Sequence, residues 1–291
     1  MIRRLLRSLT ARSARAAYGI FGGGPKEQPE QPPRSLVFNP PEVYWNQSFG
    51  TPLDSKPNGK IVVFGLPKSG NTWVQSLIAD YFDLPGIEPI LDINKRGVGM
   101  CHWPFRDDFV TRDDFLHAVY VVRDVRDVIV SFFHYSQTEY FLKARPEFHY
   151  HDIDSFYYEW FLSRMVTTYR WHTHSIEYAA LGIPVVRYER LCKDPLGEFE
   201  RVIRRWGLEV DEERVKAAVQ KNSIDQLKAA GKQLNVYVPP SHFRKGGSGG
   251  YLEELPPHII LDANQRFADL LKRWGYPQAR EHLSADHNVT G

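Results

Sequence analysis

The sequence predicts an α/β fold with three layers, in which helices cover both faces of a central, mostly parallel sheet. Three short apolar runs predict the strands, at 61–64, 117–122 and 185–188. Apolar residues recur every three or four positions in the segments that follow, which is the spacing of an amphipathic helix. Strands that alternate with helices form right-handed βαβ units, and these place the strands in parallel.

Each predicted element has a local reason. Gly65 and Arg123 end the first two strands, and Gly182 ends a long amphipathic segment. Pro195 stands early in a helix, where its missing N–H is tolerated, and Asp211 has the short acceptor side chain of an N-cap. Helices are expected at 72–82, 126–137, 153–181 (one or two helices), 195–206 and 257–274, with a further short helix after Asp211.

The chain has 291 residues, which is enough for one large domain with a buried core. Residues 1–35 form a basic amphipathic segment followed by a Pro/Gly-rich linker, and no second linker appears after them. We therefore expect one domain over 36–280 and a short tail over 281–291.

The first 25 residues carry several arginines and no acidic residue. Apolar residues between 2 and 20 are spaced so that a helix would place them on one face and the arginines on the other. Three interpretations remain open: a helix lying on an anionic membrane surface, an organelle transit peptide, or a helix docked on its own domain. The arginines are Arg3, Arg4, Arg7, Arg12 and Arg15.

The composition argues against several classes of protein. The formal net charge is +2, so a general nucleic-acid binder is not expected and any anion binding should be local. Cys101 and Cys192 form neither a zinc motif nor a disulfide framework, and they predict ordinary thiols in a reducing compartment. No run of eighteen apolar residues predicts a membrane-spanning helix. No cluster of metal ligands is evident, and we expect no bound metal.

The loop at 65–72 joins the first strand to the first helix. Such a loop directs backbone N–H groups and the positive end of the helix dipole toward an anion. Gly65 and Gly70 match the two glycines of the ATP-binding P-loop, but Asn71 stands where that loop carries its lysine. The lysine lies inside the loop instead, as Lys68. The sequence therefore predicts a P-loop-like three-layer fold that binds a phosphate ester other than ATP.

The heptapeptide PKSGNTW at 67–73 resembles the phosphosulfate-binding PKSGTTW of the cytosolic-type sulfotransferases that use 3′-phosphoadenosine 5′-phosphosulfate (PAPS). The resemblance implies that Lys68 contacts the bridging oxygen and that Trp73 stacks on adenine. Asn71 replaces the usual threonine, but its amide keeps a donor, so we expect binding to persist. Four residues are implied to hold the 5′-phosphate: Ser69, Gly70, Asn71 and Thr72.

A second anion site is predicted after the second strand. Arg123 and Ser131 stand eight residues apart, and a turn followed by a helix would let both face one phosphate. By itself the segment would also fit a surface helix of ion pairs. The stretch YVVRDVRDVIVSFFHY, however, resembles the 3′-phosphate motif of the same family. The resemblance implies that Arg123 and Ser131 bind the 3′-phosphate. Arg126 and Asp127 are expected to have structural roles.

A glycine-rich loop at 242–250 completes the implied nucleotide site. It resembles the family's RKG loop, in which Arg244, Lys245 and Gly246 would bind the 3′-phosphate. Gly250 and Tyr251 replace the usual Asp and Trp, which puts the packing of this loop in doubt more than its phosphate contacts. Two further positions are implied on the adenine side, Tyr188 and Asn222.

His102 is the candidate base. An acceptor hydroxyl must lose its proton as it attacks, and histidine titrates near neutrality. The segment MCHWP resembles a KxHxP-like element of the family, with His102 and Pro104 matching and Met100 in place of the lysine. The resemblance, which covers about 60–276, implies in-line transfer with His102 and Lys68 as catalytic residues and no metal.

The function expected from the sequence is transfer of a sulfuryl group from PAPS to a hydroxyl acceptor, leaving PAP as product. The acceptor is expected to be a small molecule, a lipid-linked alcohol or a carbohydrate. A cytoplasmic location is expected, with membrane contact through residues 2–20 left open. Two alternatives are a kinase that needs ATP and Mg²⁺, and a module that binds adenosine bisphosphate without turnover. A kinase of this type would need the P-loop lysine, and this chain has Asn71 at that position.

Overall fold

The structure is a computed structural model that describes residues 59–87, 95–105, 115–145, 149–234 and 237–277. The expected N-terminal segment and linker, the domain boundary at residue 36 and the tail over 281–291 lie outside the described residues.

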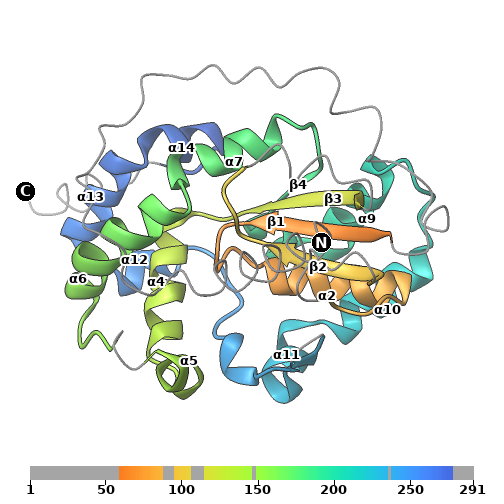
Figure 1. The fold of residues 1–291 in the computed structure, drawn as a ribbon, viewed down its shortest axis with the longest axis horizontal. Helices are drawn as coiled ribbons and strands as arrows, with labels where there is room; N and C mark the ends of the chain where they lie inside the picture. Colours follow the sequence, from red (N-terminus) through yellow and green to blue (C-terminus); the bar gives the residue numbers. More distant parts are fainter. Residues whose placement is uncertain (1–58, 88–94, 106–114, 146–148, 235–236, 278–291) are drawn as a thin grey trace, which may run out of the picture.

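A parallel sheet of four strands forms the centre of the molecule (Figure 1). The spatial order is β2-β1-β3-β4, and all three neighbouring pairs run parallel. This arrangement confirms the predicted α/β class and the mostly parallel sheet. The strands are β1 (Lys60–Gly65), β2 (Gly97–Cys101), β3 (Phe115–Val122) and β4 (Val185–Arg187).

Two strand predictions need correction. No strand was predicted at β2, because its sequence GVGMC is short and two of its five residues are glycines, which are unfavourable in strands. The third predicted strand was one residue too long: Tyr188 is the first residue of the next helix. The β2 strand matters for the site because it delivers the chain directly to His102.

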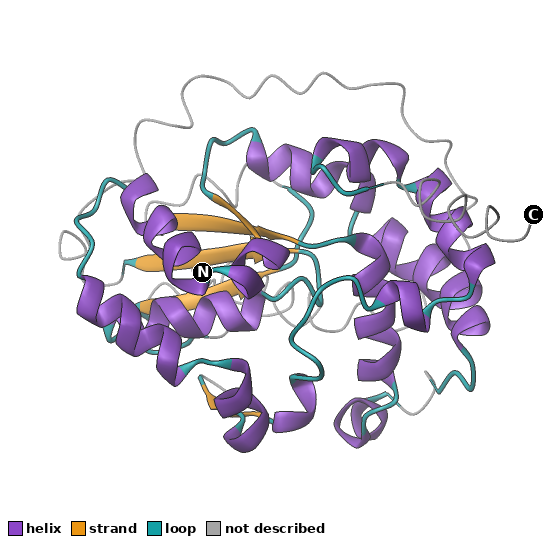
Figure 2. Cartoon of the chain, turned by 180° about the vertical axis from the view of Figure 1, so that it is seen from behind, coloured by secondary structure: helices purple, strands orange, loops and turns teal. Residues whose placement is uncertain are grey.

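The helices cover both faces of the sheet, as the two opposite views show (Figures 1 and 2). A two-stranded antiparallel hairpin, β5 (Lys232–Gln233) with β6 (Tyr237–Val238), lies beside them. In chain order the helices are α2 (Asn71–Phe82), α4 (Val125–Ser136), α5 (Glu139–Ala144), α6 (Ile153–Ser155), the π-helix η4 (Phe156–Val166), α7 (Trp171–Ala179), α8 (Tyr188–Lys193), α9 (Pro195–Arg205), α10 (Glu212–Lys221), α11 (Ile224–Ala230), the 3₁₀ turn η5 (Pro240–His242), α12 (Tyr251–Glu254), α13 (Pro257–Arg266) and α14 (Ala268–Arg273).

Most predicted helices are present. Those expected at 72–82, 126–137 and 195–206 correspond to α2, α4 and α9, and the Asp211 carboxylate caps α10 by accepting the N–H of Arg214 at 3.0 Å. The segment expected at 153–181 divides into α6, η4 and α7, with Arg170 in a left-handed conformation before α7. The helix expected at 257–274 divides at Phe267 into α13 and α14.

Each face of the sheet has its own hydrophobic core. Ile61 and Val63 of β1 point to the face covered by α2 and α9, and Val62 and Phe64 point to the opposite face, covered by α4 and α7. This alternation is the period of two that a strand imposes on its side chains. Because both faces are covered, all eight residues of β3 are buried, and the run is apolar except for His117.

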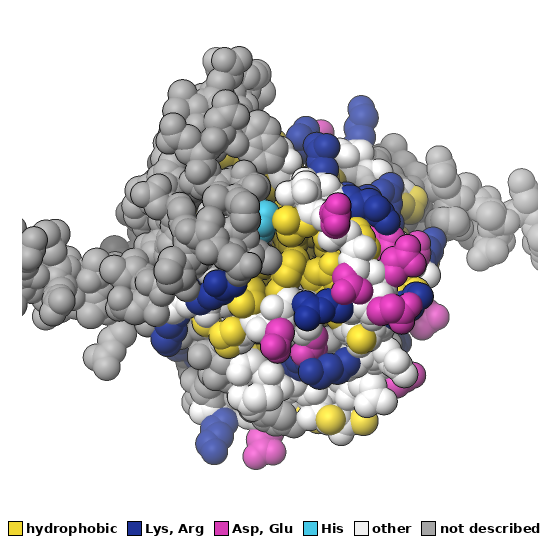
Figure 3. Space-filling model, turned by 90° about the vertical axis from the view of Figure 1, so that its right-hand side faces the viewer, with side chains coloured by type: hydrophobic (Ala, Val, Ile, Leu, Met, Phe, Trp, Pro, Cys, Tyr) yellow, Lys and Arg dark blue, Asp and Glu magenta, His cyan; other side chains and the backbone are white. Residues whose placement is uncertain are grey.

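On the surface in Figure 3, acidic and basic side chains are interspersed around an apolar area. This mixture agrees with a composition in which 37 basic residues nearly balance 35 acidic ones. Within the described part of the chain, no helix is both long and apolar enough to cross a membrane.

A buried ion pair joins the end of β3 to the last helices. The Arg126 side chain is fully buried and donates to both carboxylate oxygens of Asp124, from Nε at 2.9 Å and from Nη2 at 2.6 Å. Its Nη1 donates to Asn264 of α13 at 2.8 Å, and its guanidinium lies 4.2 Å from the ring centroid of Tyr251. The same guanidinium therefore contacts α4, α12 and α13.

We expect Arg126→Met to lower the free energy of unfolding by about 3–5 kcal/mol, because it leaves Asp124 charged and buried without its partner. Urea denaturation followed by tryptophan fluorescence measures this loss. Arg204→Met is the matched control, since its side chain is 62% exposed and pairs with Glu200 on the surface. That change should cost about 1 kcal/mol at most. Equal losses in the two variants would contradict a structural role for the buried pair.

Candidate active site

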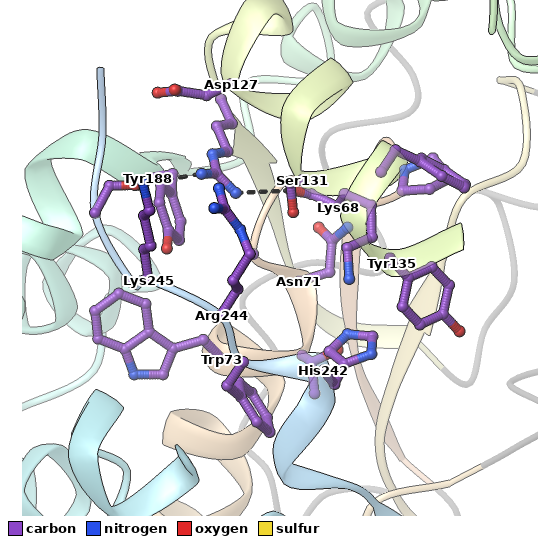
Figure 4. A pocket seen from close by; sticks show the side chains of 18 of the residues that line it. Lys68, Asn71, Trp73, Asp127, Ser131, Tyr135, Tyr188, His242, Arg244 and Lys245 are labelled. Carbon is purple, nitrogen blue, oxygen red and sulfur yellow. Dashed lines mark hydrogen bonds between the residues drawn. The ribbon is translucent and has the colours of Figure 1, made fainter. Parts of the chain in front are cut away.

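A cavity of about 550 Å³ opens where the strands of the sheet end. The loop after β1, His102 after β2, Arg123 after β3 and Tyr188 after β4 all line it, together with the glycine-rich loop before α12. The carboxyl ends of the strands in a parallel sheet meet at one edge, which is where such sheets bind ligands. Figure 4 shows Tyr188, Arg244 and Lys245 on one side of the cavity and Lys68 and Tyr135 on the other.

The structure brings together nearly all of the residues predicted for the site. The two exceptions are Ser69 and Asn222, which are buried but do not line the cavity. The predicted residues that do line it are Lys68, Gly70, Asn71, Thr72, Trp73, His102, Arg123, Ser131, Tyr188, Arg244, Lys245 and Gly246.

The loop after β1 presents an open helix N-terminus to the cavity. Gly70 occupies the N-cap position of α2 in a left-handed conformation (φ 101°), and no side chain caps the helix. Lys68 also has a positive φ, 67°, which is uncommon for a residue with a side chain. The N–H groups of a helix's first turn lack carbonyl partners and attract anions. The loop is therefore suited to a phosphate group.

Tyr188 packs against this loop. A Cβ atom at Gly70 would lie 2.5 Å from Cδ2 of the Tyr188 ring, which is closer than such atoms approach. The same ring lies 6.0 Å from Trp73 in an edge-on arrangement, and the Arg123 guanidinium lies 4.1 Å from its centroid. Glycine is thus required at position 70 both by the backbone conformation and by the aromatic ring beside it.

The Asn71 side chain makes a hydrogen bond within the loop. The amide nitrogen donates to the Leu66 carbonyl at 2.8 Å, so the side chain braces the loop from within. Asn71 is 3% exposed, and its Oδ1 has no hydrogen-bond partner among the described residues. The amide therefore stabilises the loop conformation.

Lys68 lies in an environment that disfavours its charge. Its Nζ is 4.1 Å from the ring centroid of Tyr135. Burial, with a smaller contribution from the nearby Arg123 cation, lowers the pKa of Lys68 to about 7. A bound anion would restore the ordinary preference for the ammonium form.

His102 has a defined tautomer. Its Nδ1 lies 2.6 Å from the Gly65 carbonyl oxygen, and a carbonyl can only accept, so Nδ1 carries the proton. Nε2 is then the unprotonated nitrogen. Burial lowers the pKa of His102, the bond to Gly65 opposes this, and the Lys68 charge lowers the pKa further. At neutral pH the ring is neutral and able to accept a proton.

A second, fully buried histidine holds the segment that carries His102. Nε2 of His174 donates to the carbonyl oxygens of Trp103 at 2.9 Å and His102 at 3.2 Å, and Nδ1 accepts the Tyr120 hydroxyl at 2.8 Å. Burial lowers the pKa of His174 to about 4, so it stays neutral. The Tyr178 hydroxyl also donates to the Trp103 carbonyl, at 3.1 Å. The backbone after β2 is therefore tied to β3 and α7.

Arg123 connects the two loops of the cavity. It donates to the Lys68 carbonyl from Nη1 and to the Gly247 carbonyl from Nη2, each at 3.2 Å. Its Nε is buried and has no hydrogen-bond partner among the described residues. An unpaired buried donor is costly, so this nitrogen is suited to an anion such as a phosphate oxygen.

The glycine-rich loop is anchored despite its departures from the expected sequence. The Asp127 carboxylate accepts the N–H of Gly249 at 2.7 Å and that of Tyr251 at 3.1 Å. Tyr251 is 5% exposed and packs against Arg126. Asp127 and Arg126, which the sequence leaves structural, together fix this loop, and Asp127 also lines the cavity.

Asn222 supports the site from outside the cavity. Its carbonyl accepts the indole N–H of Trp73 at 2.8 Å, and its amide donates to Asp80 at 2.6 Å. Asn222 therefore orients the Trp73 ring, and its predicted place on the adenine side stays a prediction. Ile224, two residues further on, lines the cavity instead.

Three comparisons with known proteins bear on this arrangement. The model of the Sulfotransferase domain family matches residues 110–275, more than half of the chain. The chain belongs to the sulfotransferase family. The matched residues begin after the loop at 65–72 and after His102, so the assignment does not depend on either of them.

This sulfotransferase also resembles curated proteins of the same kind. It is 23% identical to Sulfotransferase 1A1 of the dog (Canis lupus familiaris) over 73% of this chain and 82% of the relative. It is 24% identical to Cytosolic sulfotransferase 3 of Arabidopsis thaliana over 68% of this chain and 72% of the relative.

Solved structures share its fold. The crystal structure of mouse sulfotransferase SULT7A1 complexed with PAP has a TM-score of 0.59 and 20% identity, and the match covers 79% of this chain and 90% of the other. A retinol dehydratase in complex with androsterone and PAP has a TM-score of 0.56 and 18% identity, with coverage of 73% and 80%. These matches support the P-loop-like three-layer architecture.

Three residues that line the sulfotransferase cavity are not among the site residues predicted from the sequence: Phe132, Tyr135 and His242. The rings of Tyr135 and His242 meet edge-on, 5.2 Å apart, although they lie on α4 and on η5. Phe132 and Tyr135 follow Ser131 within one helical turn, which could have identified them. Nothing local distinguishes His242 from the other histidines. Among the described residues, no three His, Cys, Asp or Glu side chains gather where they could hold a metal ion.

We expect Gly70→Ala to destabilise the sulfotransferase by about 2–4 kcal/mol, from backbone strain of about 1 kcal/mol and overpacking against Tyr188 of about 1–3 kcal/mol. Gly207→Ala is the matched control, because Gly207 also has a positive φ, 76°, but no atom lies within 4 Å of the added Cβ. Urea denaturation of both variants separates the two contributions. Equal losses would show that the Tyr188 contact is unimportant.

Proposed function

We propose that this sulfotransferase transfers a sulfuryl group from PAPS to the hydroxyl group of an acceptor, and that His102 is the base. The observation that carries the proposal is a single cavity with His102 and Lys68 on its wall together with the cations Arg123 and Arg244. PAP, which is PAPS after loss of the sulfuryl group, is present in the mouse SULT7A1 structure. PAP needs a pocket that accepts phosphate at both ends, and two sets of anion-binding groups are available here.

In this proposal the open N-terminus of α2 and Lys68 hold the 5′-phosphate, and Trp73 and Tyr188 contact adenine. Arg123, Ser131 and the pair Arg244–Lys245 hold the 3′-phosphate. The supporting observations are the uncapped helix and the unpaired Nε of Arg123. Ser69 and Asn222 are left out of the binding set, because neither lines the cavity.

The proposed reaction is an in-line displacement. The acceptor oxygen attacks sulfur, the bond between sulfur and the bridging phosphate oxygen breaks, and Nε2 of His102 takes the hydroxyl proton. The leaving phosphate gains negative charge, which Lys68 and the N–H groups at the start of α2 stabilise. His102 is suited to this role because its bond to Gly65 leaves Nε2 free of a proton.

The acceptor is proposed to be a small molecule with a hydroxyl group. Aromatic side chains of Phe132, Tyr135 and Tyr140 line the cavity and offer apolar contact area. The retinol dehydratase structures contain androsterone or retinol, both apolar alcohols. The proposal also covers a lipid-linked alcohol or a carbohydrate as acceptor. It further includes a cytoplasmic location, which the name of the Arabidopsis relative supports, and membrane contact through residues 2–20.

The kinase alternative is less well supported. Asn71 stands at the position of the P-loop lysine, and its amide is already bonded to the Leu66 carbonyl. The lysine of a P-loop follows the second glycine, whereas Lys68 comes before Gly70. A purely nucleotide-binding module would not need the buried bonds that fix the segment of His102.

The decisive experiment is transfer of labelled sulfate from PAPS to a panel of phenols, sterols and sugars. We expect turnover by the wild type and none with ATP and Mg²⁺ in place of PAPS. His102→Ala should lower kcat by about 10²–10⁴-fold while PAP still binds. Lys68→Ala should lower kcat by about 10²–10³-fold.

Two matched variants serve as controls: His258→Ala and Lys216→Ala, whose side chains are 56% and 55% exposed. Both should retain wild-type turnover. Phosphate transfer from ATP without sulfate transfer from PAPS would reject the proposal, and full activity of His102→Ala would reject the base.

The pKa of Lys68 predicts that PAP binding takes up a proton. In the free protein this pKa is about 7, so at about pH 8 most of the side chain is neutral, and a bound phosphate then raises the pKa and draws a proton. At about pH 6 the side chain is already charged, so little uptake is expected. Affinity for PAP should therefore fall as pH rises through 7.

Isothermal titration in two buffers of different ionisation enthalpy measures this uptake. Lys68→Met is the control, because the nucleotide's own phosphates still titrate in that variant. The wild type should take up more protons than the variant at about pH 8, and the same number at about pH 6. Identical uptake by both proteins at the higher pH would contradict the lowered pKa.

A further inference from the structure

The two cations proposed for the 3′-phosphate already have an anionic partner. Nη1 of Arg244 lies 3.0 Å and 2.9 Å from the two carboxylate oxygens of Glu254, and Nζ of Lys245 lies 2.8 Å from one of them. Glu254 is the last residue of α12, just beyond the glycine-rich loop. The pairing is therefore made within one short stretch of chain.

A third donor reaches the same carboxylate from another element. Nε2 of His134, on α4, lies 2.7 Å from Oε2 of Glu254. Burial favours the neutral acid, but hydrogen bonds from Lys245, His134 and Arg244 outweigh it and lower the pKa of Glu254 to about 2. Glu254 is thus an anion at any working pH, and it lies beside the wall that is proposed to take the 3′-phosphate.

We propose that Glu254 is an internal stand-in for the nucleotide's 3′-phosphate: it pairs with Arg244 and Lys245 in the free protein and competes with that phosphate for them. This inference rests on the proposed function. Carboxylate and phosphate are recognised by the same donors, a planar guanidinium fork and an ammonium. A phosphate that enters must therefore take donors away from Glu254.

The surroundings allow such an exchange. The Glu254 side chain is 18% exposed, and those of Arg244 and Lys245 are 32% and 54% exposed, so none is locked in the core. Gly249 and the start of α12 are held by Asp127, not by Glu254. The loop can then stay anchored while the side chains exchange partners, and His134 remains available to Glu254.

The competition has a consequence for selectivity and for turnover. Only a nucleotide with a 3′-phosphate meets Glu254, so the carboxylate weakens the binding of PAPS and PAP and leaves adenosine 5′-monophosphate unaffected. Weaker binding of PAP speeds its release, a step that limits turnover in many enzymes. Glu254 therefore sets how firmly the product is held.

Glu254→Gln tests the inference, because it keeps the shape of the side chain and removes its charge. We expect PAP to bind roughly tenfold more tightly and to dissociate more slowly by a similar factor. Affinity for adenosine 5′-monophosphate should stay within about twofold. Titration calorimetry gives the affinities, and stopped-flow displacement gives the dissociation rate.

Glu253→Gln is the matched control. It removes the same charge one residue away, but Glu253 is 81% exposed and lies 3.8 Å from Lys245. We expect its effect on PAP affinity to be about twofold or less. Unchanged or weaker PAP binding by Glu254→Gln would overturn the inference, since a carboxylate that merely orients Arg244 would strengthen phosphate binding.

A crystal structure of the wild type with PAP gives a second test that does not depend on the folding of a variant. Glu254 should have left Arg244, and a phosphate oxygen should have taken its place. Retention of the Arg244–Glu254 contact beside bound PAP would overturn the inference. Failure of the wild type to bind PAP at all would instead reject the proposed function, so the two outcomes are distinct.

Discussion

The contacts of the Arg123 guanidinium are those on which the rest of the site depends. Its guanidinium donates to the Lys68 carbonyl and to the Gly247 carbonyl, and it stacks on Tyr188. Three segments that are far apart in the sequence are thereby fixed around one cation at the end of β3. Among the residues that the structure describes, its partners are carbonyl oxygens and an aromatic ring and no carboxylate forms an ion pair with it, so its charge remains available to an anion.

The electrostatics of the cavity contrast with those of the whole molecule. The chain is close to neutral, yet Lys68, Arg123, Arg244 and Lys245 all reach one cavity. Bringing cations together out of water is unfavourable, and the structure relieves this in two ways. The pKa of Lys68 is lowered, and Glu254 neutralises the other pair. A ligand with phosphates at both ends reverses both adjustments.

His102 and His174 show how one residue type takes different roles. His102 keeps one nitrogen free and faces the cavity, whereas both nitrogens of His174 are engaged, by the Tyr120 hydroxyl and by two carbonyls. His174 can neither reach a ligand nor gain a proton near neutral pH. Its bonds hold the backbone of His102, so the position of the proposed base rests on packing around β3 and α7.

The sequence by itself determined the parallel sheet, the loop between β1 and α2 and the charged residues Lys68, Arg123, Arg244 and Lys245 of the cavity, because these depend on local periodicity and on short contiguous motifs. It missed β2, whose glycines carry no strand signal, and it gave no sign of the bond between Asn222 and Trp73, which spans 149 positions. The pairing of His134 with Glu254, 120 positions apart, was decided only by the tertiary structure. Burial, tautomers and ion-pair partners depend on segments that meet only when the chain folds, so no local pattern encodes them.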